Sequence, residues 1–137
     1  MGANPGAQDL AHEIERLRQK RDAGARYVLT QPVYDHEVFS RFIERAAPLG
    51  LPILIGILPL ASLRNALFLN NNVPGMAIPT PILDRMERAP EGPDARAMGL
   101  AIAREALLDA RPLVQGTYIM PPFGSAQSAL DVLAALE

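Results

Sequence analysis

The hydrophobic positions of the chain alternate between two spacings, one typical of helices and one typical of short buried strands. Apolar residues recur at helical spacing from Leu10 onward, and Asn4 followed by Pro5 is a suitable start for that helix. The next run is short and rich in β-forming residues, as in a buried parallel strand. The first two predicted elements are therefore a helix over about 7–23 and a strand over 26–31.

The same alternation continues to the end of the chain. Asp35, Ser62, Thr80 and Ser125 each precede a helical pattern and are suitable N-terminal caps. The predicted helices span about 36–49, 62–69, 81–88 and 94–110, with a last helix after Ser125, and the predicted strands span 52–58, 76–78 and 113–120.

Helices and strands in this order imply a parallel sheet with right-handed crossovers. The predicted strands are too few for a closed (β/α)8 barrel, which has eight strands and typically ~250 residues. Gly56 is isolated within its strand and does not extend into the glycine-rich pattern of dinucleotide-binding folds. We find no internal boundary, so residues 1–137 are expected to form a single α/β domain.

Composition and charge exclude several functional classes. The chain has no cysteine, and its two histidines, His12 and His36, lie far apart, so disulfides, cysteine nucleophiles and a metal site are not expected. A net charge of −2 gives no basic surface for nucleic acid. No window approaches the ~18 apolar residues of a membrane span, and the N-terminus lacks the features of a secretory signal. We expect a cytoplasmic protein.

Polar groups that follow strands are the first candidates for ligand binding in a parallel α/β protein. Gln31 ends the strand 26–31, and its amide offers one acceptor and two donors to a flat heterocycle or, alternatively, to a neighbouring loop backbone. Tyr34 can stack on a ligand ring or cover the rim of the sheet. Asp35 is favoured as a helix cap over a role as general base.

Two more residues admit both a binding and a structural interpretation. Lys20 lies near the end of the first predicted helix, where a cation also favours the helix dipole. Phe123 follows Pro121 and Pro122, which fix the backbone and can either hold the ring against a ligand or simply end a strand. No residue of the chain is indicated as a catalytic acid.

Three segments together resemble the methylenetetrahydrofolate reductase family. They are Asp22 to Asp35, which contains Asp-Ala-Gly-Ala, an apolar strand and Thr-Gln; 52–59, which reads Pro-Ile-Leu-Ile-Gly-Ile-Leu-Pro; and 72–79. The segments occur in the family's order and near its spacing, and the likeness extends over nearly the whole chain. The resemblance implies the C-terminal half of a (β/α)8 TIM-type barrel, in which parallel strands alternate with helices.

Members of this family reduce 5,10-methylenetetrahydrofolate to 5-methyltetrahydrofolate with NAD(P)H and bound FAD. The resemblance implies that Gln31 binds the folate pterin and that Lys20 contacts the phosphate or ribose region of FAD, while Tyr34 and Phe123 are further candidates for substrate contact. The family's catalytic glutamate lies in the first half of the barrel. The resemblance therefore implies that this chain needs a missing N-terminal half and is inactive without it.

The chain departs from the family pattern near its C-terminus. Single-function bacterial members carry an arginine for folate at about the position of Phe123, whereas 120–124 resembles the reductase part of proteins fused to a homocysteine S-methyltransferase. The helix bearing Leu69 also lacks an aromatic residue that some members stack on substrate. Two alternatives stay open: a non-catalytic half-barrel that binds or assembles, with a possible homo-oligomer, and a different barrel enzyme with a phosphate or sugar ligand.

Overall fold

One parallel sheet organises the molecule. The computed structural model describes all residues 1–137, and its strands lie side by side in the order in which they occur along the chain, β1-β2-β3-β4. This is the arrangement of one side of a (β/α)8 barrel. The predicted fold class is confirmed: the chain is an α/β protein with a parallel sheet and alternating helices, consistent with part of a TIM-type barrel. The strands are β1 (Gly2–Ala3), β2 (Val28–Pro32), β3 (Ile53–Ile57) and β4 (Gly116–Ile119).

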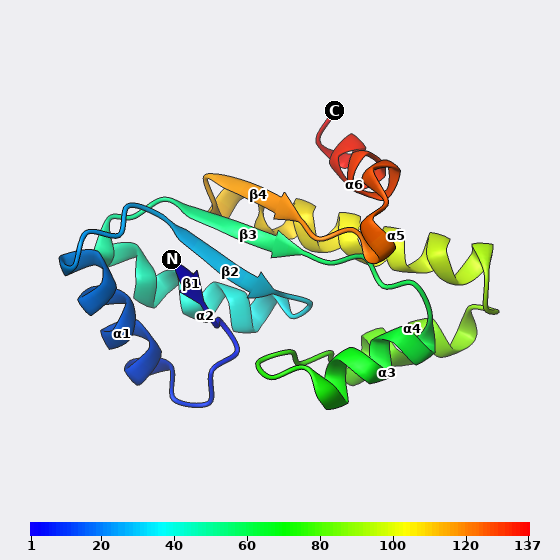
Figure 1. Ribbon diagram of the computed structural model, residues 1–137, viewed down its shortest axis with the longest axis horizontal. Coiled ribbons are helices and arrows are strands. Elements are labelled where there is room, and N and C mark those ends of the chain that lie inside the picture. Colours follow the sequence, from blue (N-terminus) through cyan, green and yellow to red (C-terminus); the bar gives the residue numbers. More distant parts are fainter.

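Helices connect and follow these strands. Helices α1, α2 and α5 lie on one face of the sheet, whereas α3 and α4 form a pair beyond the carboxyl ends of β2 and β3 (Figure 1). None of the six helices is long and apolar enough to cross a membrane. The helices are α1 (Leu10–Asp22), α2 (His36–Ala46), α3 (Leu63–Asn72), α4 (Thr80–Arg88), α5 (Pro93–Ala110) and α6 (Ala126–Leu133), and short 3-10 turns span Ala47–Leu49, Arg111–Leu113, Pro122–Gly124 and Ala134–Leu136.

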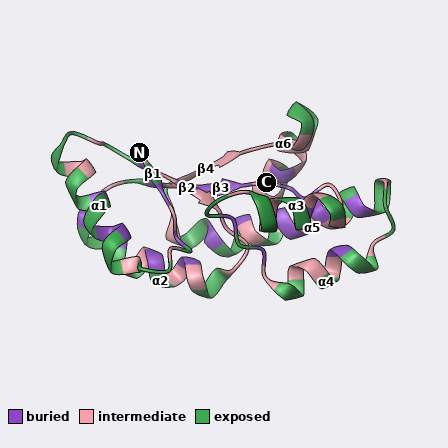
Figure 2. Ribbon diagram, turned by 60° about the horizontal axis from the view of Figure 1, so that its bottom comes forward, coloured by how far each residue is buried: buried purple, intermediate pink, exposed green.

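The hydrophobic core fills the space between the sheet and these helices (Figure 2). Phe39 and Phe42 of α2 are almost completely buried and their rings stack with centroids 6.3 Å apart. They pack in the same cluster as Leu17 of α1 and Ile55 of β3. A second, smaller cluster, which includes Met86, joins α4 to α3 and α5. The core therefore covers one face of the sheet only.

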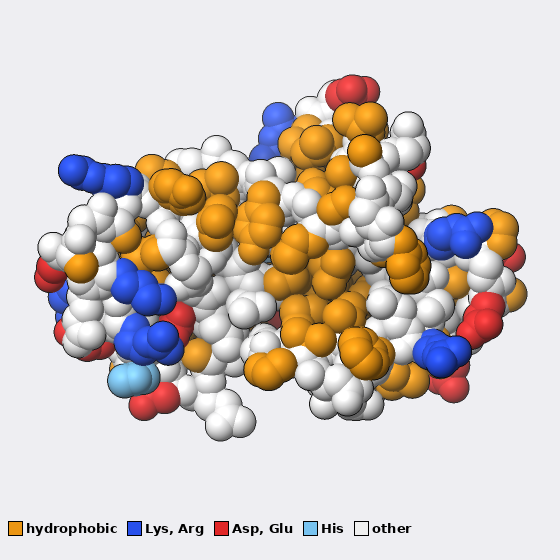
Figure 3. Space-filling view, viewed as in Figure 1, with side chains coloured by type: hydrophobic (Ala, Val, Ile, Leu, Met, Phe, Trp, Pro, Cys, Tyr) orange, Lys and Arg blue, Asp and Glu red, His pale blue; other side chains and the backbone are white.

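The other face of the sheet has no helix over it. Along β2 the side chains alternate, so that Val28 and Thr30 are buried while Leu29 and Gln31 are partly exposed. Figure 3 shows hydrophobic side chains collected over the middle of the molecule in the same view as Figure 1. In a closed barrel the face that carries Leu29 and Gln31 would be the interior.

The helix caps predicted from local sequence are largely confirmed. The Asp35 carboxylate accepts hydrogen bonds from two main-chain N–H groups of α2 at 2.9 and 3.1 Å, which is the capping role preferred over a general base. Ser62 and Ser125 accept the corresponding bonds at the starts of α3 and α6. Thr80 is the exception, since it lies inside α4 and Pro79 takes the cap position without a side-chain hydrogen bond.

Two further predictions are wrong. The first helix begins at Leu10 with Asp9 as its cap, rather than near Asn4, because the chain before it forms β1 and pairs with β2. The segment 76–78 is not a strand. The amide carbonyl of Asn70 accepts the N–H of Ile78 at 2.8 Å, and Ile78 packs in the smaller cluster away from the sheet.

Candidate functional site

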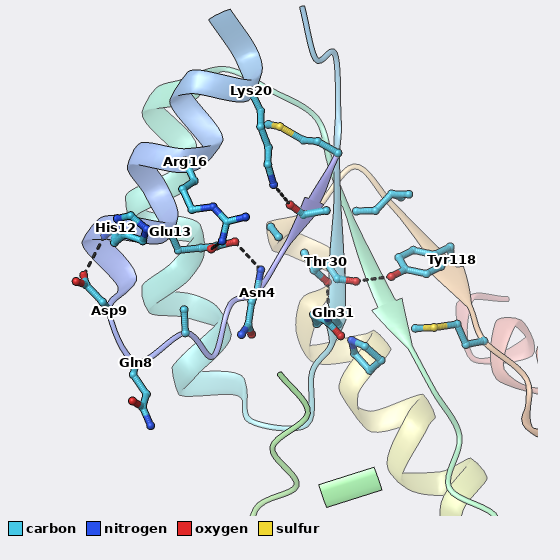
Figure 4. Close-up of a pocket in the computed structure, with 17 residues that line it drawn as sticks. Asn4, Gln8, Asp9, His12, Glu13, Arg16, Lys20, Thr30, Gln31 and Tyr118 are labelled. Carbon is cyan, nitrogen blue, oxygen red and sulfur yellow. Dashed lines mark hydrogen bonds and ion pairs between the residues drawn. The ribbon is translucent and has the colours of Figure 1, made fainter. Parts of the chain in front are cut away.

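A cavity of about 810 Å³ lies at the β1 edge of the sheet, between α1 and the strands β2 and β4 (Figure 4). We call it the α1 cavity. It brings together segments that are far apart in sequence: β1 with the loop that follows it, one face of α1, the end of β2, and β4. Its polar lining includes Asn4, Gln8, Asp9, His12, Glu13, Arg16, Lys20, Thr30, Gln31 and Tyr118.

Basic residues lie along the α1 side of this cavity. His12, Arg16 and Lys20 are four residues apart, so they project from one face of the helix. The Lys20 ammonium donates to the main-chain carbonyl of Gly2 at 3.0 Å and has further donors available. No group of three or more histidine, aspartate or glutamate side chains is placed to hold a metal ion. The α1 side of the cavity is therefore suited to an anionic organic ligand.

Glu13 fixes the loop that forms the adjacent wall. Its side chain is buried, and one carboxylate oxygen accepts the N–H of Asn4 at 2.8 Å while the other lies 3.7 Å from Arg16. The sequence pattern alone does not single out Glu13. The available signal was its position four residues before Leu17, which places an acidic side chain on the apolar face of the helix.

Gln31 lies at the end of β2 and lines the same cavity as Lys20. Its side-chain amide makes no hydrogen bond to a protein group, so its acceptor and its two donors are unpaired. The turn at Gly75 packs against it: a Cβ on Gly75 would lie 3.5 Å from the Gln31 amide nitrogen and 3.4 Å from that of Asn4.

The other two candidates for substrate contact lie elsewhere. The ring of Tyr34 packs against the smaller cluster, its hydroxyl donates to the Leu58 carbonyl at 2.8 Å, and burial raises the pKa of this phenol above its ordinary value. Tyr34 faces a neighbouring cavity of about 300 Å³, which shares Asn4 and Pro32 with the α1 cavity. Phe123 is 93% exposed and lines neither of these two cavities.

Known proteins are similar to this chain in sequence. The family model described as methylenetetrahydrofolate reductase matches residues 2–116. The chain belongs to the methylenetetrahydrofolate reductase family. It is 30% identical over 108 residues to the 5,10-methylenetetrahydrofolate reductase of Pectobacterium carotovorum subsp. carotovorum. It is 33% identical over 105 residues to methylenetetrahydrofolate reductase (NADH) 1 of Arabidopsis thaliana, and 31% identical over 97 residues to a probable methylenetetrahydrofolate reductase (NADPH) of Caenorhabditis elegans.

The matches cover most of this chain and a small part of each reductase. They include 74%, 71% and 67% of the chain, but only 35%, 16% and 14% of the bacterial, plant and nematode proteins, respectively. The family match includes Lys20 and Gln31 and ends at Gly116, so it does not extend to Tyr118 or Phe123. The residues that establish the reductase family therefore include β1 to β3 and the helices α1 to α5.

Proposed function

We propose that this chain is the C-terminal half of a flavin-dependent reductase barrel that converts 5,10-methylenetetrahydrofolate to 5-methyltetrahydrofolate with NAD(P)H. One observation carries the proposal: Gln31 and Lys20, expected separately to bind folate and FAD, line a single cavity. The lining of that cavity includes Leu29 and Gln31, whose side chains lie on the sheet face that would be the interior of a closed barrel. The family to which the chain belongs supports the same reaction.

The residues of the α1 cavity fit part of FAD. Its volume of about 810 Å³ is within the usual range for ligand pockets. Arg16 and Lys20 supply positive charge for a pyrophosphate group, and the Glu13 carboxylate beside them can accept hydrogen bonds from ribose hydroxyls. When bound, FAD would carry the hydride between NAD(P)H and folate. In this proposal Lys20 holds the phosphate or ribose region, while Gln31 orients the pterin edge.

The proton needed for the reaction is assigned to the rest of the barrel. Both carboxylates that line the α1 cavity have other roles, because Asp9 caps α1 and Glu13 holds the N–H of Asn4. The phenol of Tyr118 donates to the main-chain carbonyl of Thr30. In this proposal the chain binds and orients FAD and folate, and it has no evident general acid.

We expect the isolated chain to show no measurable reductase activity. The half-barrel leaves the cavity open on the side where further strands would close it, and it contributes no catalytic acid. An NAD(P)H–menadione oxidoreductase assay with added FAD tests this directly. Turnover of ~1 s⁻¹ or more by the purified chain, a rate usual for enzymes, would contradict the expectation. The matched control is the same assay on a complete reductase that contains this chain, where turnover is expected.

We also expect the isolated chain to self-associate. Each of β1 and β4 pairs on one side only, which leaves two free sheet edges. Large hydrophobic side chains are exposed as well, among them Phe68 and Leu130 at 58% and 59%. Sedimentation at micromolar concentration should show oligomers. A clean monomer that unfolds cooperatively would point instead to an independent domain.

The alternative function is a non-catalytic half-barrel that binds or assembles. Its only specific support is the same pair of free edges and exposed apolar side chains. A complete protein that contains this chain and binds neither FAD nor folate would favour it. A cytoplasmic location and a place in one-carbon metabolism, which includes methionine biosynthesis, belong to the reductase proposal.

A further inference from the structure

Strand β2 is irregular at the position of Gln31. From Leu29 to Pro32 it advances three residues, while its partner β3 advances two, from Leu54 to Gly56. One extra residue is therefore accommodated on β2 at Thr30–Gln31. Such bulges bend a strand and re-aim a side chain, and they are common beside functional sites.

Thr30 holds one side of this bulge. Its side chain is fully buried, and its hydroxyl accepts the N–H of Gly56 at 3.0 Å and donates to the carbonyl of Gln31 at 2.9 Å. The N–H of Gly56 is therefore bonded to a side chain of β2 rather than to a regular main-chain partner. The main-chain carbonyl of Thr30 remains for another donor.

Tyr118 supplies that donor from a strand that does not neighbour β2. Its hydroxyl donates to the Thr30 carbonyl, so its ring crosses β3 to reach β2. Burial also raises the pKa of this phenol above its ordinary value. Figure 4 shows Tyr118 and Gln31 around the same cavity, with the hydrogen bond from Tyr118 to Thr30 beside the bulge.

Gly56 allows the tyrosine to cross. A Cβ at this position would lie 2.6 Å from the Thr30 carbonyl oxygen and 2.8 Å from the Tyr118 hydroxyl, distances at which atoms collide. Glycine within a strand often marks such a close approach. The isolated glycine of the Ile-Gly-Ile sequence is therefore required for this close approach of Tyr118 to Thr30. We call Thr30, Gly56 and Tyr118 the tyrosine latch.

We propose that Tyr118 is a positioning residue for Gln31. By fixing the Thr30 carbonyl, its hydroxyl holds the bulge that directs the Gln31 amide into the α1 cavity. The inference rests on the proposed function, because it takes Gln31 as a folate-binding residue. The family match ends before Tyr118 and assigns it no role.

The test is Tyr118→Phe in a complete reductase that contains this chain. Loss of one hydrogen bond that orients a binding group should weaken binding of 5-methyltetrahydrofolate about tenfold, measured by calorimetry. FAD content and the rate of flavin reduction by NAD(P)H should change less than about twofold. The control is Tyr27→Phe, which removes the same hydroxyl from a side chain that is 49% exposed and should leave folate affinity unchanged.

A double-mutant cycle separates positioning from a merely structural effect. In a Gln31→Ala background, Tyr118→Phe should weaken folate binding less than about twofold, because the group it positions is gone. The positioning role of Tyr118 would be overturned by an undiminished tenfold loss of folate affinity in that background. Normal folate binding in Tyr118→Phe alone would overturn it as well. Failure of the unsubstituted protein to bind folate would overturn the proposed function itself, and the latch with it.

Discussion

Gly99→Ala is expected to destabilise the protein by about 3 kcal/mol or more, at the upper end of the effects of overpacking. A Cβ at this position would lie 1.7 Å from the main-chain oxygen of Leu60 and 2.6 Å from its carbonyl carbon. Neither side can yield easily. Gly99 is buried within α5, and Leu60 is 1% exposed in the loop between β3 and α3. The helix and the loop must therefore separate to admit a single methyl group.

The sign of the change makes this experiment decisive. At an open position inside a helix, alanine is more stable than glycine by roughly 1 kcal/mol, so a large loss at Gly99 reports the contact with Leu60. Urea unfolding of the original and substituted proteins at one matched protein concentration measures it, because the stability of a self-associating chain depends on its concentration. Gly2→Ala is the control, since a Cβ there meets no atom within 4 Å and should change the free energy of unfolding by less than about 0.5 kcal/mol. A Gly99→Ala protein as stable as the original would show that α5 does not pack on this loop.

Local chemistry explains which parts of the fold could be predicted from sequence. Asp35, Ser62 and Ser125 cap helices through bonds to residues two or three positions ahead, so a short window of sequence contains all the necessary information. β1 was missed because two residues show no periodicity. It exists only because Gly2 and Ala3 pair with β2, whose position depends on the whole sheet.

The candidate site also combines residues that a single sequence segment can indicate with contacts that depend on the whole sheet. Gln31 and Lys20 are predicted to bind ligands because each lies in a segment that resembles the reductase family, and both line one cavity. Tyr118 and Gly56 could not be understood in this way. Their contact depends on the pairing of β3 with β4 and on the bulge in β2, and neither is visible in any one segment of sequence.

Gln31→Ala should have the largest effect on the proposed reaction. In a complete reductase that contains this chain, we expect FAD to stay bound and the folate half-reaction to slow by roughly ten- to a hundredfold. This corresponds to the ~1–3 kcal/mol typical of a hydrogen-bonded contact whose partner is left unpaired. The amide lies at the end of β2 with no partner in the protein, so its removal should leave the fold unchanged.

Rapid-mixing kinetics can separate the two half-reactions of this variant. Flavin reduction by NAD(P)H should change much less than the folate step, unless nicotinamide uses the same contact, because the cations that we assign to FAD lie on α1 rather than on β2. Gln19→Ala is the matched control, since this glutamine is exposed on α1 and does not line the cavity. Loss of flavin from Gln31→Ala, or normal folate turnover, would show that Gln31 is structural. Slowing confined to the folate step would instead place the pterin edge at the end of β2, beside the bulge that Thr30 and Tyr118 hold.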